Sequence, residues 1–292
     1  MAGRLQDKVA IVTGAGTGIG EAIAHTFARE GARLLLAGLP GDPVADVCAA
    51  VAERGGEARI HVGNLAEEED ARACVQAAID GFGRLDVLVN NAGVFLAVAE
   101  TQDYPIDAFE ETLRHNLRSV FLMTRFALPH LRQTRGCIVS AGSESGTIGL
   151  AQNAVYGATK GWIHAFTRGV AVEQAPYGVR ANCVCPGPID TAWTHKETGP
   201  MTEEMERTTV ESTALGRLGT PEEVAGVYAF LASDEASYVT GALWAVDGGV
   251  TVAKGSVGTK VPDELRAEPQ PTLPLRHSRD GLANKNVRHA AE

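Results

Sequence analysis

The amino-acid sequence predicts an α/β protein built on a doubly wound parallel sheet. Three observations carry this prediction. Short stretches rich in Val, Ile and Leu alternate with longer amphipathic stretches between residue 8 and about residue 250. The short stretches are apolar throughout, which is typical of parallel strands covered by helices on both faces. A glycine-rich turn follows the first of them, and right-handed crossovers between such strands produce a doubly wound sheet.

The elements follow one another in a regular order. Seven strands are expected, at residues 8–14, 32–38, 57–63, 85–93, 136–142, 179–187 and 241–249. The intervening helices are expected at residues 20–31, 43–56, 67–83, about 106–134 (two helical stretches), about 153–177, and 221–234. No linker rich in Pro and Ser divides residues 1–250. We therefore expect a single Rossmann-like domain with a seven-stranded parallel sheet over this range.

Residues 251–292 have a different composition and form a polar C-terminal extension. They contain no aromatic residue, four prolines, and seven Lys or Arg against five Asp or Glu. This tail is mildly basic, whereas the rest of the chain is acidic. Either it is a mobile tail, or it is an arm that wraps a neighbouring acidic subunit close to its active site.

The charge balance limits the possible partners. The 292 residues carry a formal net charge of −10, which argues against nucleic acid or an anionic membrane as the main partner. The first ten residues lack the apolar core of a signal peptide, and no apolar run approaches the roughly 18 residues that span a bilayer. A soluble, cytoplasmic protein is expected.

The five cysteines are interpreted as reduced packing residues, with no metal site. They are Cys48, Cys74, Cys137, Cys183 and Cys185, and no two have C-x-x-C spacing. Cys183 and Cys185 lie two residues apart in a predicted strand, so their side chains share one face.

The segment "TGAGTGIG" (13–20) lies where the first strand turns into the first helix. Gly14 permits the tight turn, Gly18 lets a pyrophosphate approach the backbone, and Gly20 allows the helix to pack closely on the strand. The N-terminus of the helix then offers free N–H groups and a positive dipole to phosphates. The segment therefore predicts a dinucleotide site.

The spacing G-x-x-x-G-x-G resembles that of the short-chain dehydrogenase/reductase family, and the resemblance extends over residues 6–250. "NNAG" (90–93) matches the family's segment after the fourth strand, and "VCPGPIDT" (184–191) matches the stretch that passes the nicotinamide. Asn64 stands where the family commonly has an Asp near adenine. The resemblance implies cofactor contacts from Gly14, Thr17, Gly18, Ile19, Gly38, Asp42, Asn64, Leu65, Asn91, Ala92, Gly93, Tyr156, Lys160, Pro186, Gly187, Ile189 and Thr191.

Tyr156 and Lys160, in "YGATK", lie four residues apart on one face of a predicted helix. Oxidation of a secondary alcohol requires a base for the hydroxyl proton, and free tyrosine, with a pKa of about 10, is a poor base at neutral pH. The ammonium group of Lys160 and an oxidised nicotinamide would lower that pKa. Ser143 can hold the substrate oxygen against Tyr156. The resemblance adds Asn116, which stabilises a helix kink and a water that links Lys160 to solvent.

These residues predict an NAD(P)-dependent oxidoreductase that interconverts a secondary alcohol and a ketone. One alternative is a catalytically idle dinucleotide-binding regulatory module, which the intact set Asn116, Ser143, Tyr156 and Lys160 disfavours. Another is a lyase on the same scaffold, which lacks the nucleotide loop and has Arg in place of Lys. An enoyl reductase would space Tyr and Lys by seven residues rather than four.

Several residues near the expected substrate site have two interpretations. Glu144 is either a solvated charge or a group that faces the substrate and favours polar, hydroxylated compounds. Gln152 and Asn153 have the same two interpretations. Trp193 and His195 lie in the segment 192–217, which covers the substrate in this fold, and either line the pocket or pack within the lid.

The end of the second strand, "LLLAGLPGDP" (34–43), bears on the choice of cofactor. Many relatives that use NAD have an Asp at the end of this strand. Relatives that use NADP often have an Arg near this point or a basic residue just before the second glycine of the loop. This chain has Gly38, Leu39 and Thr17 at these positions. Asp42 either accepts hydrogen bonds from the adenosine ribose or caps the next helix before Pro43. The absence of a cation favours NAD, without excluding NADP. The family's usual pairing of helices at about 116–134 and 153–177 implies a homotetramer or a dimer.

Overall fold

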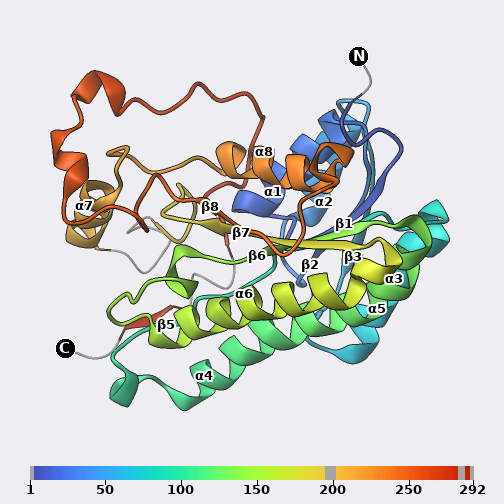
Figure 1. Ribbon diagram of the computed structural model, residues 1–292, viewed down its shortest axis with the longest axis horizontal. Helices are drawn as coiled ribbons and strands as arrows, with labels where there is room; N and C mark the ends of the chain where they lie inside the picture. Colours follow the sequence, from blue (N-terminus) through green and yellow to red (C-terminus); the bar gives the residue numbers. More distant parts are fainter. Residues whose placement is uncertain (1–2, 195–201, 282–286, 290–292) are drawn as a thin grey trace.

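The computed structural model describes residues 3–194, 202–281 and 287–289. Seven parallel strands form one sheet in the order β3-β2-β1-β4-β6-β7-β8 (Figure 1). The strands are β1 (Val9–Thr13), β2 (Arg33–Gly38), β3 (Glu57–Val62), β4 (Val87–Asn90), β6 (Cys137–Ala141), β7 (Arg180–Pro186) and β8 (Leu243–Val246). This confirms the predicted doubly wound sheet. The winding direction reverses between β1 and β4, where folds of this kind bind their ligands.

Helices cover both faces of the sheet. One layer contains α1 (Gly18–Arg29), α2 (Val44–Ala52) and α8 (Pro221–Ala232), and the other contains α3 (Glu68–Phe82), α5 (Ser119–Thr134) and α6 (Ala154–Gln174) (Figure 1). Helix α4 (Ile106–Leu113) runs into α5 through one π-helical turn, Arg114–Arg118. Helix α7 (Glu203–Ser212) lies within the segment that the sequence analysis treated as a covering loop.

Alternate residues of the central strands pack on opposite faces. In β1, Ala10 and Val12 pack with α1 and α8, whereas Val9 and Ile11 pack with α3 and α5. This period of two is the expected pleat of a strand. The edge strand β3 departs from the prediction of burial on both faces, because Ile60 is 45% exposed and Val62 is 49% exposed. An edge strand has a neighbour on one side only, and the covering helices do not reach over all of β3.

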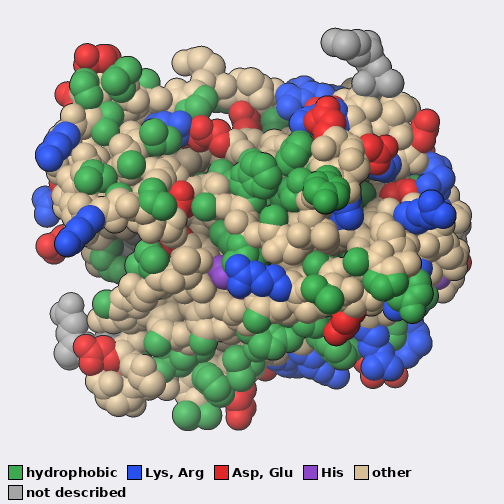
Figure 2. Space-filling view, in the orientation of Figure 1, with side chains coloured by type: hydrophobic (Ala, Val, Ile, Leu, Met, Phe, Trp, Pro, Cys, Tyr) green, Lys and Arg blue, Asp and Glu red, His purple; other side chains and the backbone are tan. Residues whose placement is uncertain are grey.

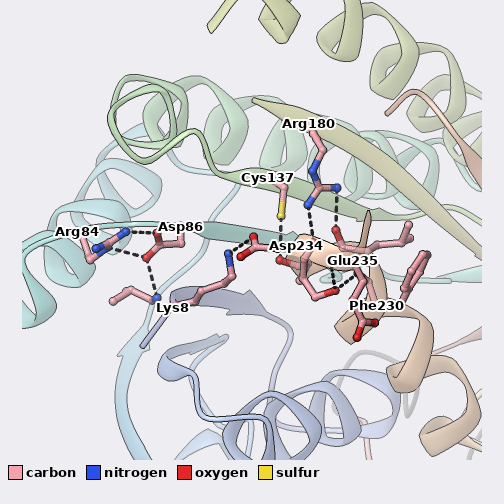
Figure 3. Close-up of polar contacts among 12 residues, drawn as sticks. Lys8, Arg84, Asp86, Cys137, Arg180, Phe230, Asp234 and Glu235 are labelled. Carbon is pink, nitrogen blue, oxygen red and sulfur yellow. Dashed lines mark hydrogen bonds and ion pairs between the residues drawn. The ribbon is translucent and has the colours of Figure 1, made fainter. Parts of the chain in front are cut away.

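Polar contacts tie the sheet together at the amino ends of its strands (Figure 3). Asp86 accepts a hydrogen bond from the backbone N–H of Val9 at 2.9 Å, and Lys8 forms an ion pair with Asp234 at 2.7 Å. The guanidinium group of Arg180 donates to carbonyl oxygens at and just after the end of α8, at 2.9 and 3.1 Å. These contacts serve stability at the edge opposite the nucleotide loop.

The C-terminal extension folds back over its own domain. It carries the short strand β9 (Arg288–His289), which pairs in parallel with β5 (Ala97–Val98). The described part of the extension therefore contacts the chain to which it belongs, rather than only a neighbouring subunit as the sequence analysis considered. Figure 2 shows acidic and basic side chains interspersed on one face of the molecule. Among the described residues, no helix has the length and apolar character needed to cross a membrane.

Candidate active site

The glycine-rich turn has the conformation that its sequence predicts. Gly14 adopts φ 60°, and a Cβ atom there would lie 2.9 Å from the Cα of Ala92. A Cβ on Gly20 would collide with the carbonyl oxygen of Gly14. Only glycine allows this positive φ and these close approaches without strain. The turn therefore holds the N-terminus of α1 tightly against the end of β1.

The segment after β4 supports this turn from the side. The Thr13 hydroxyl accepts hydrogen bonds from the backbone N–H groups of Asn91 and Ala92, both at 3.0 Å, and donates to the carbonyl of Val89 at 3.1 Å. The Asn91 side-chain amide donates to the carbonyl oxygens of Thr13 and Gly14, at 3.1 and 3.2 Å. The first residues of "NNAG" thus support the glycine-rich turn.

A cavity of about 740 Å³ opens at the carboxyl ends of the strands, a size ordinary for a small-molecule site. All the residues expected to contact the cofactor line it: Gly14, Thr17, Gly18, Ile19, Gly38, Asp42, Asn64, Leu65, Asn91, Ala92, Gly93, Tyr156, Lys160, Pro186, Gly187, Ile189 and Thr191. Ser143 also lines the cavity, whereas Asn116 is not among the lining residues and lies behind Gly93. The sequence-predicted site is therefore brought together in one place.

Tyr156 projects from α6 into an aromatic wall of this cavity. Its ring meets Phe95 edge-on with ring centroids 5.1 Å apart, and Trp193 with centroids 5.6 Å apart. Burial raises the pKa of Tyr156 above its ordinary value, and contact with the Ser143 hydroxyl opposes this rise. In the protein alone, the tyrosine pKa is therefore raised, and Lys160 does not produce the lowering that the sequence analysis expected from it together with an oxidised nicotinamide.

Lys160 lies under the tyrosine ring, with its Nζ 5.4 Å from the ring centroid. The ammonium group donates a hydrogen bond to the carbonyl oxygen of Ala141 at 2.9 Å. Burial lowers the pKa of Lys160 to about 8, against the opposing effect of the nearby Cys183 and Cys185 thiols. A lysine with this pKa can exchange a proton near neutral pH.

Asn116 lies in the π-helical turn between α4 and α5, which is the kink that the sequence analysis expected. Its side-chain oxygen accepts from the Val94 N–H at 2.7 Å, and its amide donates to the Val94 carbonyl at 3.0 Å and to the Thr159 hydroxyl at 3.3 Å. A Cβ on Gly93 would lie 3.4 Å from the Asn116 oxygen and 3.7 Å from Lys160 Nζ. Asn116 and Lys160 thus flank one small space.

At the adenosine end, Asp42 closes a tight turn after β2. Its carboxylate accepts a hydrogen bond from the Leu39 N–H at 2.9 Å and lines the cavity, and burial raises its pKa. The N-cap of α2 is Pro43, without a side-chain cap, so Asp42 is not the helix cap that was the alternative interpretation. The side-chain oxygen of Asn64, Oδ1, accepts a hydrogen bond from the Ala66 N–H at 3.1 Å.

At the end of the cavity opposite the adenosine end, the carboxyl group of Glu144 is not a solvated surface charge. Burial, with a smaller effect from Asp247, raises the pKa of Glu144 to about 7. Glu144 Oε2 and Asn153 Oδ1 are both buried, lack a hydrogen-bond partner among the described residues, and belong to side chains that line the cavity. Gln152 and Trp193 line it as well. His195 lies outside the described residues.

Sequence reasoning missed two features near the site. It placed Cys183 and Cys185 on one strand face but did not anticipate His164, whose Nε2 lies 3.3 Å from Cys185 Sγ, with the two sulfur atoms 4.0 Å apart. The hydrogen bond with Cys183 and the nearby His164 hold the pKa of Cys185 below its usual value. A histidine at a helical position gives no sequence signal for such a contact.

The second missed feature is that the C-terminal extension contributes to the cavity of its own chain, because Asp280 and Gly281 line it; the sequence analysis considered only the active site of a neighbouring subunit. The extension has no periodic pattern that would place it there.

Known proteins resemble this chain over the region that forms the cavity. A family model described as enoyl-(acyl carrier protein) reductase matches residues 14–251. Meso-2,3-butanediol dehydrogenase of Serratia marcescens is 40% identical over 254 residues, covering 86% of this chain and 98% of that protein. The crystal structure of levodione reductase matches with a TM-score of 0.82 and 33% identity, covering 86% of this chain and all of that one.

L-fucose dehydrogenase of Bos taurus is 37% identical over 280 residues, covering 92% of this chain and 99% of that protein. This share is larger than residues 1–250 alone could supply, so the similarity extends into the C-terminal extension.

Proposed function

Because this chain belongs to the short-chain dehydrogenase/reductase family, we propose that it interconverts a secondary alcohol and a ketone, with NAD as the preferred cofactor, through Ser143, Tyr156 and Lys160. The observation that carries this proposal is the presence of these three side chains and the glycine-rich loop on the walls of one cavity. Residues 1–250 are the catalytic domain in this proposal, and residues 251–292 are its extension. An idle binding module would have no need of this combination.

Each residue has a distinct task. Ser143 donates a hydrogen bond to the substrate oxygen and orients it toward Tyr156. Tyr156 removes the hydroxyl proton during oxidation and returns it during reduction. Lys160 stabilises the tyrosinate and passes the proton onward, past Gly93 toward Asn116. The nicotinamide, when bound, takes up or delivers the hydride and in its oxidised form adds positive charge beside Tyr156.

The preference for NAD rests on the charge at the adenosine end of the cavity. Asp42 and Gly38 line this end, and Lys160 is the one Lys or Arg among the described residues that line the cavity. A 2′-phosphate placed beside Asp42 would meet a carboxylate without a compensating cation. A ribose with free hydroxyls can instead donate hydrogen bonds to that carboxylate.

The substrate proposed for this site carries hydroxyl groups next to the reacting carbon. Glu144 Oε2 and Asn153 Oδ1 are buried beside Ser143 and Tyr156 with no partner among the residues described, and an unpaired buried polar atom costs about 1–3 kcal/mol. A vicinal diol or a sugar would satisfy both atoms while its reacting hydroxyl met Tyr156. The names of two relatives, a butanediol dehydrogenase and a fucose dehydrogenase, fit the same class.

We also propose a cytoplasmic homotetramer. The long helices α5 and α6 expose apolar side chains, with Phe121 44% exposed and Val172 78% exposed, as expected if helices of this kind pair across subunits. Light scattering on the purified protein tests this point, and a monomer at micromolar concentration would contradict it. The five free cysteines fit a reducing compartment.

The test of the function is a screen of matched alcohols with NAD and with NADP, followed by nicotinamide absorbance. The pairs are 2,3-butanediol with 2-butanol, and 1,2-cyclohexanediol with cyclohexanol. We expect kcat/KM for the diols to exceed that for the mono-alcohols by about 100-fold or more, because a site that binds a hydroxyl strongly rejects analogues lacking it. Equal rates would reject the substrate class, and no turnover of any alcohol or ketone would reject the function.

A further inference from the structure

Part of the C-terminal extension, residues 272–281, lies against the N-terminus of α1 and reaches the cofactor cavity at Asp280 and Gly281; we call this segment the strap. It passes α8 and α1 on its way to the cavity (Figure 1). Leu273 and Leu275 pack against the hydrophobic core that α1 and α8 share. The strap is therefore attached to the surface of its own domain, and not only adjacent to it.

Three acidic side chains from separate elements hold the strap. Glu222 of α8 accepts hydrogen bonds from the backbone N–H groups of Thr272 and Leu273, the latter at 2.7 Å. Glu21 of α1, only 1% exposed, accepts from the N–H groups of Arg276 and His277, at 2.6 and 2.9 Å.

The third anchor lies near the C-terminal end of the strap. Arg279 makes a bidentate ion pair with Asp190, just after β7, at 3.0 and 2.7 Å. Glu21 lies in α1 and Asp190 follows β7, so a segment fixed to both runs from the first helix to the end of β7.

Between these anchors the strap passes the N-terminus of α1. The backbone N–H of Gly18 donates to the carbonyl oxygen of His277 at 3.2 Å. The Ser278 carbonyl lies 3.5 Å from the place where a Gly18 side chain would stand, beside the methyl group of Thr191. Pyrophosphate groups bind at such helix termini. The strap therefore lies at the expected position of the cofactor phosphates, where it occupies the Gly18 N–H, one of the helix N–H groups that were expected to be free.

The strap walls the cavity rather than filling it. Asp280 and Gly281 line a space that still measures about 740 Å³ with the strap in place. We propose that the strap is part of the dinucleotide site: it closes over the bound cofactor, and its release from Glu21, Glu222 and Asp190 sets the rate at which the cofactor leaves. This rests on a dinucleotide occupying the cavity, and not on the identity of the alcohol substrate.

The experiment measures the dissociation rate of NADH from the full-length protein by stopped-flow fluorescence. The test protein is the double variant Arg279→Ala, Glu222→Ala, which removes two outer anchors and leaves the buried Glu21 intact. Exposed ion pairs and hydrogen bonds such as these two anchors contribute modestly to the free energy that holds the strap in place. We therefore expect NADH to dissociate about five- to tenfold faster, with a matching rise in Kd. Single-turnover hydride transfer at saturating NADH should stay within about twofold of the wild type.

The matched control is Arg72→Ala, which removes another exposed arginine from an ion pair, with Glu68 on α3, away from the cavity. It should leave the NADH dissociation rate unchanged. A chain that ends at Pro271 serves as a second test, with circular dichroism to confirm folding, and should release NADH faster still. An unchanged rate in the double variant would overturn the proposal. So would tighter NADH binding in it, since the strap would then compete with the cofactor.

Discussion

Glu144→Gln should stabilise the protein at alkaline pH and not at acid pH. Burial raises the pKa of Glu144 from 4.5 to about 7. Below pH 4.5 the carboxyl is protonated in both folded and unfolded chains, so it adds no pH-dependent cost. As pH rises from 4.5 to 7, the unfolded chain loses this proton first, and stability falls. Above pH 7 the full cost is present, and glutamine, which does not ionise, avoids it.

The size of the stability difference follows from the same shift in the pKa of Glu144. At 1.36 kcal/mol per pH unit, it corresponds to an upper bound of about 3 kcal/mol, and water entering the cavity reduces this to about 1–3 kcal/mol. The assay is urea unfolding of wild type and variant at pH 4 and pH 8, with Glu100→Gln, an exposed glutamate, as the control. A difference between the variant and the wild type that is the same at both pH values would refute the reasoning.

Two further variants test the adenosine end and the scaffold. Asp42→Ala should raise kcat/KM with NADP about tenfold, because it removes a carboxylate from the expected position of the 2′-phosphate; steady-state kinetics with both cofactors check this, and an unchanged preference would reject the role of Asp42. Arg180→Met should lower the unfolding free energy by about 2–3 kcal/mol, because the variant lacks the guanidinium group that donates hydrogen bonds to several backbone carbonyl oxygens (Figure 3). Its NADH affinity should not change, and Arg168→Met, at an exposed position of α6, should change neither quantity.

Local sequence patterns predicted much of the fold and the site. The apolar strands and the glycine-rich turn depend on interactions between residues close in sequence, and so does the spacing of Tyr156 and Lys160. In the structure, the central strands, the glycine-rich turn, Tyr156 and Lys160 accordingly lie in the predicted elements. Apolar composition failed as a guide to burial at the edge strand β3, where Ile60 and Val62 are exposed. Position in the sheet, which no single strand encodes, decides burial there.

The strap could not be predicted for a different physical reason. Its bonds to Glu21 and Glu222 use backbone N–H groups, which every residue except proline carries. Glu21 and Glu222 themselves look like ordinary acidic residues in the first turn of a helix. Likewise, the pairing of β9 with β5 joins two residues on each side, too few for a period to be recognised.

The most direct test of the central claim compares Tyr156→Phe with Tyr104→Phe. Tyr104 is also buried, but it does not line the cavity and its hydroxyl lies 3.4 Å from that of Thr112. For Tyr156→Phe, we predict a Kd for NADH within about twofold of the wild type and a fall in kcat of about 1,000-fold on the best alcohol of the screen. Tyr104→Phe should keep most of its turnover. A Tyr156→Phe enzyme that retains more than about a tenth of the wild-type kcat would contradict the assignment of Tyr156 as the acid–base group.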